Sequence, residues 1–192
     1  MVISQIVFAL FLATGVYFFA GSVGVIRRNI FLGKPQDISD NKPQRWRNLI
    51  LLALGQKKMF KNPLVAFLHL IIYAGFIIIN IEVLEIIIDG ITGKHRVFLP
   101  FIGSYYSLFI NVFELLAFGV TVVCVIFLVR RNILYIKRLR SNDLAGWPKT
   151  DANLILVVEI VLISLFFLMN GADQALQNLQ VAHYAPTGSF IV

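Results

Sequence analysis

Four long apolar segments constrain this chain more than any other feature. They cover about residues 3–26, 63–88, 105–129 and 152–170. The first segment has 24 residues, and at about 1.5 Å per residue it makes a helix of about 36 Å, longer than a bilayer core of about 30 Å. Lipid offers no hydrogen-bond partner to the backbone, so such segments cross it as helices. The sequence therefore predicts an all-α membrane protein, a single domain built as a bundle of four transmembrane helices.

The overall composition agrees with a membrane protein. Only 14% of the residues are charged, against about 25% in soluble domains, and 58% are hydrophobic. The chain has one cysteine, Cys124, which excludes an intrachain disulfide and an iron–sulfur cluster held by four thiolates of this chain.

The distribution of basic residues predicts the topology. The loops 27–62 and 130–151 contain nine and six of the 17 Lys and Arg residues. By the positive-inside rule both loops are cytoplasmic and the N-terminus is outside. The positive charges follow the first segment, whereas a signal peptide carries them before its apolar run, so this segment is expected to remain as an anchor. The net charge of +7 therefore reflects topology, and we exclude nucleic acid as a partner.

A shorter amphipathic stretch lies in the first basic loop. Trp46, Leu49, Ile50 and Ala53 recur at helical spacing among basic residues. Two interpretations remain open: a helix lying on an anionic membrane surface, or a helix covering a partner subunit.

His69 is the only histidine within an apolar segment. A neutral imidazole is the usual protein ligand of haem iron, and Gly75 leaves room for a flat macrocycle. The alternative is a histidine that is hydrogen-bonded to a neighbouring helix. His95 and His183 belong to the opposite side of the membrane, so a second axial ligand would come from a missing segment or another subunit.

Four carboxyl groups also lie within the apolar segments, where ionisable groups are costly. Glu159 lies at a depth similar to that of His69 and is a candidate proton relay for a quinol. Its alternatives are a helix–helix hydrogen bond or an ion pair with Arg130 or Lys149. The other three lie toward the outer side, where structural hydrogen bonds are expected and Glu85 is expected to reach the interface; they are Glu82, Glu85 and Glu114.

After the fourth apolar segment the sequence is polar, and its last residues are apolar again. Gly171 is expected to begin a polar tail that holds Asp173 and His183. The last residues, 190–192, are apolar, so the chain is expected to be a truncation of a five- or six-helix module.

Several short runs carry a family resemblance. These are Leu-Gly-Gln-Lys-Lys-Met-Phe-Lys-Asn-Pro at 54–63, Leu-His at 68–69, Tyr-Ala-Gly-Phe at 73–76, Thr-Asp-Ala at 150–152 and Asn-Gly at 170–171. Together they resemble the N-terminal membrane part of heterodisulfide-reductase-related (Fe–S)-binding oxidoreductases. That part is similar to the cytochrome b (gamma) subunit of respiratory nitrate reductase.

The resemblance implies a membrane-embedded haem b electron-transfer domain, with His69 as one axial ligand and its partner histidine on a fifth helix. It would link the quinone pool to a cytoplasmic iron–sulfur domain or subunit, in the bacterial cytoplasmic (inner) membrane. The nitrate reductase subunit has a second histidine about ten residues after the first, but this chain has Ile79 there, so only one, inner haem is expected. The rival interpretation is a non-redox membrane scaffold or transporter fragment, which would show polar substrate groups at the midplane or broken helices.

Overall fold

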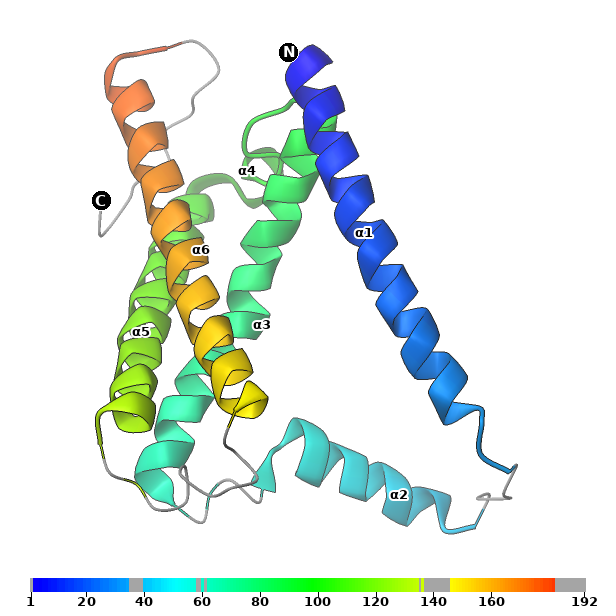
Figure 1. Cartoon of the computed structure of the whole chain (residues 1–192). Helices are drawn as coiled ribbons and strands as arrows, with labels where there is room; N and C mark the ends of the chain where they lie inside the picture. The colour runs from blue at the N-terminus through cyan, green and yellow to red at the C-terminus, as the bar shows by residue number, and fades with distance from the viewer. Residues whose placement is uncertain are drawn as a thin grey trace. The chain divides into compact units, whose positions relative to one another are not determined.

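The computed structural model describes residues 2–34, 40–57, 60, 62–134, 136 and 146–181. These residues form helices and their connections, with no strand among them (Figure 1). The main helices are α1 (Val2–Ile30), α2 (Lys42–Asn48), α3 (Pro63–Thr92), α4 (Leu99–Ile102), α5 (Tyr106–Asn132) and α6 (Trp147–Asn178). Among the described residues, four helical stretches are long and apolar enough to cross a membrane: Ile3–Ile30, Pro63–Thr92, Leu99–Asn132 and Trp147–Asn178. The predicted all-α membrane class is confirmed.

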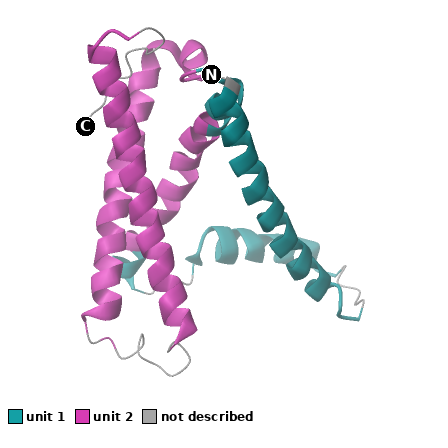
Figure 2. Cartoon of the chain, turned by 45° about the horizontal axis from the view of Figure 1, so that its top comes forward, with its two compact units in different colours: residues 1–66, 87–94 teal, residues 67–86, 95–192 magenta. Residues whose placement is uncertain are grey.

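The described residues divide into two compact units, coloured separately in Figure 2. The first comprises residues 1–66 and 87–94, so it contains α1, α2 and both ends of α3. Within it, the side-chain amide of Gln5 donates to the carbonyl of Ile91 at 3.3 Å, and a side chain at Gly90 would collide with the ring of Phe8. Gly93 then ends α3 with a φ of 69°, a left-handed conformation that glycine adopts readily.

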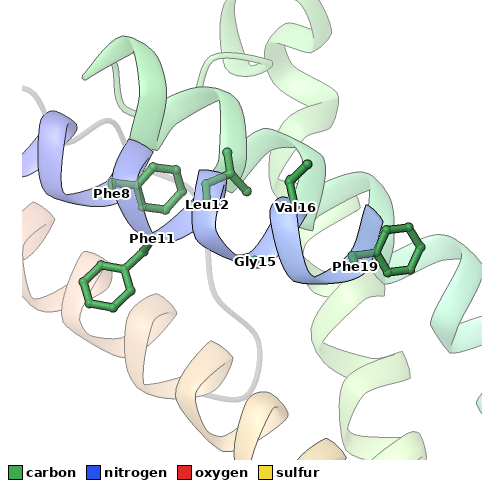
Figure 3. A pocket seen from close by; sticks show the side chains of 6 residues that line it. All are labelled: Phe8, Phe11, Leu12, Gly15, Val16 and Phe19. Carbon is green, nitrogen blue, oxygen red and sulfur yellow. The ribbon is translucent and has the colours of Figure 1, made fainter. Parts of the chain in front are cut away.

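Apolar side chains of the first unit remain exposed along α1 and α2. An open hollow of about 400 Å³ runs along one side of α1 (Figure 3); it is lined by Phe8, Phe11, Leu12, Gly15, Val16 and Phe19. Trp46 of α2 is also exposed, and α2 continues into a π-helical stretch, Leu49–Leu54, that is exposed as well. Both surfaces suit lipid or another protein, and both interpretations of the amphipathic stretch remain predictions. The basic residues Lys58 and Lys61 lie outside the described residues.

The second unit comprises residues 67–86 and 95–192, and its described part packs α5 against α6 and the middle of α3 (Figure 2). Small and branched side chains form its core: Ala117, Val120, Cys124 and Ile163. Gly75 is buried at this contact, and a Cβ there would collide with Val120. The expectation that Gly75 leaves room for a macrocycle is therefore wrong, because the side chain of Val120 fills that space.

Helix α6 is longer than the sequence suggested. Gly171 does not begin a tail, because α6 continues to Asn178 and buries Asp173 to 4% exposure. Asn170 and Asp173 lie three residues apart, on one face of the helix, and both contact Arg96. These contacts stabilise a polar stretch as helix where its composition alone suggests a tail.

Candidate functional site

The predicted haem ligand His69 lies on α3 with its side chain exposed. Its ring centroid is 4.7 Å from that of Phe127 on α5, at an interplanar angle of 43°. Within the described residues it makes no hydrogen bond to a neighbouring helix, so neither imidazole nitrogen is engaged by this part of the chain. A free imidazole beside an aromatic ring fits one side of a haem.

The described residues supply no second histidine close to His69. His95 follows the other end of α3, where its Nε2 lies 3.1 Å from Asp173 Oδ1, and His183 lies outside the described residues. Among the described residues, His69 therefore has no second histidine with which it could form a bis-histidine site.

Glu159 lines a cavity of about 430 Å³ in the second unit. The other polar residue of its wall is Asn80 on α3, and the rest are apolar: Phe76, Ile79, Val83, Ile86, Ala117, Leu162, Ile163, Leu165, Phe166 and Met169. Among the described residues Glu159 forms no ion pair with Arg130 or Lys149. A carboxyl group on an apolar cavity wall is suited to exchange a proton with an apolar ligand that carries a hydroxyl group.

A second polar site lies near the junction of α3 and α5, and we call it the Arg96 cluster. It is built from three helices and the α3–α4 loop and consists of Glu82, Glu85, His95, Arg96, Tyr106, Glu114, Asn170 and Asp173. Seven of the eight residues are buried, to 4% exposure or less, while the side chain of His95 is 28% exposed.

The guanidinium of Arg96 is the centre of this cluster. Its Nη1 donates to Glu82 Oε1 at 2.8 Å, and its Nε and Nη2 donate to Asp173 Oδ2 at 3.1 and 3.0 Å. Nη2 also donates to Asn170 Oδ1 at 2.9 Å. Burial by itself lowers the pKa of Arg96, but the neighbouring Tyr106, Glu82 and Asp173 raise the pKa above its ordinary value, so the side chain stays cationic.

The other two carboxyl groups are held by neutral donors. Glu85 accepts hydrogen bonds from the backbone N–H of Phe98 at 2.7 Å and from the Tyr106 hydroxyl at 2.6 Å. Glu114 Oε1 accepts from the side-chain amide of Asn170 at 3.0 Å. The expectation that Glu85 reaches the interface is wrong: its side chain turns inward because these two donors lie inside the bundle.

The sequence alone does not predict five members of this cluster. From the sequence, His95 and Arg96 are expected in a short loop, Tyr106 in an aromatic belt at the interface and Asp173 in a tail, and the side chain of Asn170 has no expected role. A signal was present, since three segments each carry two polar residues at a spacing of three: Glu82 and Glu85, Asn111 and Glu114, Asn170 and Asp173. That spacing places each pair on one helix face.

The Arg96 cluster is not arranged to bind a metal ion. Among the residues that the structure describes, no three His, Cys, Asp or Glu side chains form a group that could hold one. The carboxyl groups instead point to donors that already satisfy them in part.

The described residues include four apolar helices of spanning length, which define the class: this is an all-α integral membrane protein. The chain is 24% identical over 146 residues to the probable iron-sulfur-binding oxidoreductase FadF of Bacillus subtilis (strain 168). The match covers 76% of this chain and 20% of that protein, so the chain spans one fifth of the relative's length. No family model and no solved structure matches the chain. The relative's name agrees with the oxidoreductase resemblance, while the similarity to the nitrate reductase gamma subunit stays a prediction.

Proposed function

We propose that this chain is the membrane part of an iron–sulfur-dependent oxidoreductase and transfers electrons between a quinone and a cytoplasmic iron–sulfur partner. The observation that carries the proposal is the 146-residue match to an iron-sulfur-binding oxidoreductase. The matched chain has a single cysteine, and Cys124 is buried, so an iron–sulfur cluster would require ligands from elsewhere. A membrane part without cluster ligands needs another redox group.

His69 is the residue that would hold that group. Its imidazole is exposed on α3, free of hydrogen bonds to the described residues, and beside the ring of Phe127. A b-type haem bound there would carry one electron at a time across the apolar layer. The second axial ligand would come from outside the described residues, as the sequence predicts.

Glu159 and its cavity would serve the quinone. The apolar walls suit a lipid-soluble ring or chain, and Glu159 and Asn80 are the polar groups that could orient a ring oxygen. The Glu159 carboxylate would accept a proton from a quinol hydroxyl, so that the proton leaves as the electrons do. Its lack of an ion pair with Arg130 or Lys149 leaves it available for this role.

The test is a reduced-minus-oxidised absorption spectrum of membranes that contain the complete gene product. We expect a b-type haem signal that His69→Ala abolishes and Tyr73→Phe, one turn further along α3, retains. In Glu159→Gln the signal should persist, while its reduction by added quinol slows by about a hundredfold or more, the usual contribution of a positioned proton acceptor. An unchanged spectrum in His69→Ala would rule out the assignment of His69, and unchanged quinol kinetics in Glu159→Gln would rule out the proton relay.

A further inference from the structure

The Arg96 cluster holds more acidic groups than its cations can balance. Four carboxyl groups, from Glu82, Glu85, Glu114 and Asp173, surround one guanidinium, and all are buried to 4% exposure or less. With every group ionised and His95 neutral, the cluster has a net charge of −3, from one positive and four negative charges. Charge of that size inside an apolar bundle is very unfavourable, and carboxyl groups that share a site avoid it by retaining protons.

One buried oxygen indicates where a proton is retained. Oε1 of Glu82 accepts a hydrogen bond from Nη1 of Arg96. Oε2 of Glu82 is buried and has no hydrogen-bond donor within the described residues. A bare carboxylate oxygen in that position keeps its charge without solvation. As a hydroxyl the same oxygen carries no charge and becomes a donor itself. Two other buried oxygens have no hydrogen-bond donor within the described residues: Oδ1 of Asn111 on α5 and Oδ1 of Asp173 on α6.

The cluster also has a connection to water. The imidazole of His95 is 28% exposed, and its Nε2 lies 3.1 Å from Asp173 Oδ1. Asp173 in turn contacts Arg96, which contacts Glu82 and Asn170, and Asn170 contacts Glu114. Contacts between polar side chains therefore extend from an accessible histidine to the buried carboxyl groups of Glu82 and Glu114.

We propose that the Arg96 cluster is a proton-binding site, which retains at least one exchangeable proton on its buried carboxyl groups and exchanges it with water through Asp173 and His95. In the release step the carboxyl group of Asp173 holds the proton; its O–H bond breaks and the proton passes to Nε2 of His95, which lies 3.1 Å from Asp173 Oδ1, so that the imidazole becomes imidazolium. Water then takes that proton, so the cluster gains one negative charge and the imidazole is unchanged. The proposal does not rest on the haem or the quinone.

The groups that govern this proton come from every element that packs around it. On α3 they are Glu82 and Glu85, in the following loop His95 and Arg96, on α5 Tyr106 and Glu114, and on α6 Asp173. The Tyr106 hydroxyl uses its proton to donate a hydrogen bond to Glu85, and Arg96 keeps its positive charge. The exchangeable proton is therefore assigned to the carboxyl groups. A purely structural cluster would contain the same contacts but no proton that moves at ordinary pH.

Infrared spectroscopy of the full chain in lipid nanodiscs distinguishes a proton-binding cluster from a purely structural one. We expect a carbonyl stretching band of protonated carboxyl groups at neutral pH, which shifts in D₂O. Glu82→Gln or Glu114→Gln should remove intensity from it, and the exposed Asp151→Asn should leave it unchanged. If no such band is present at neutral pH, or if it persists at full intensity in Glu82→Gln, Glu85→Gln, Glu114→Gln and Asp173→Asn, the cluster retains no proton.

The path is tested separately by the rate at which the band shifts after transfer to D₂O. His95→Gln keeps a polar side chain near Asp173 but cannot bind and release a proton, so the shift should slow by about a hundredfold. An unchanged rate would remove His95 from the path. Each variant is first compared with the parent by thermal unfolding, and if Glu82→Gln does not fold it is replaced by Glu85→Gln, the amide substitution one turn further along α3.

Discussion

Arg96 shows how a single residue near a membrane helix end can connect two helices. It has a φ of 55°, a conformation that costs a non-glycine residue about 1–3 kcal/mol. The hydrogen bonds that its guanidinium makes to α3 and α6 offset this cost, and its side chain is buried to 4% exposure. The strained backbone and the buried contacts together indicate that the loop conformation is maintained by the cluster.

The first prediction concerns Arg96 itself. Arg96→Met should lower the free energy of unfolding by about 3–5 kcal/mol at neutral pH, because it leaves Glu82 and Asp173 buried without their cation. The loss should shrink as the pH falls, since a protonated carboxyl group no longer needs that cation. Arg96→Lys should lose less, because an ammonium keeps the charge but not the fork of donors.

Unfolding of the purified protein in mixed micelles measures these differences across a pH series. Lys94→Met is the matched control, since Lys94 is exposed and two residues away, and it should unfold like the parent. Equal stability of Arg96→Met and the parent at neutral pH would show that the Arg96 contacts contribute nothing to the fold.

At the scale of the helices, the packing of α3 on α5 depends on one absent side chain. Gly75 lets the two backbones approach until Val120 occupies the space that a Cβ would take. Gly119 on α5 faces the same partner helix less closely, because a Cβ there would lie 3.4 Å from Cγ2 of Ile71. Small residues commonly allow such close approach between membrane helices.

The second prediction uses this difference. Gly75→Ala should lower the free energy of unfolding by about 1–3 kcal/mol, as overpacking of a tight core does, while Gly119→Ala should be nearly neutral. Adding Val120→Ala to Gly75→Ala should recover part of the loss, so the double variant should be more stable than the sum of the two single effects implies. If the changes in unfolding free energy of the two single variants simply add up in the double variant, residues 75 and 120 are not in contact.

The helices themselves were readable from the sequence, whereas the contacts between them were not. Apolar runs longer than a bilayer core predict spanning helices with little ambiguity, and four are found. The end of α6 was misread because Gly171 and the polar residues after it resemble a tail, and only Arg96, 77 residues from Asp173, reveals what they bind. Likewise, the space beside Gly75 depends on Val120, a residue on another helix. Pairings between distant segments are not encoded in local composition.

For the whole molecule, the charges that lie outside the four apolar segments of the sequence predict how it is oriented. The loops 27–62 and 130–151 contain 15 of the 17 Lys and Arg residues, and the other two are Lys94 and Arg96. Arg96 is buried in the Arg96 cluster. Of the two Lys and Arg residues in the α3–α4 connection, only Lys94 is therefore exposed. The asymmetry between the two sides is therefore even stronger than the sequence count suggests.

The last prediction follows from this asymmetry. In a Cys124→Ser background, Lys94→Cys should react with a membrane-impermeant maleimide added to intact cells, because the positive-inside rule predicts that the α3–α4 connection faces outward. Arg47→Cys and Lys149→Cys should react only after the cells are permeabilised, since both lie in the basic loops that the same rule places inside. The parent with its buried Cys124 should stay unlabelled in both conditions. The reverse pattern would place the Arg96 cluster on the cytoplasmic side, and its protons would then exchange with the cytoplasm. The labelling experiment therefore decides which compartment the proposed proton site serves.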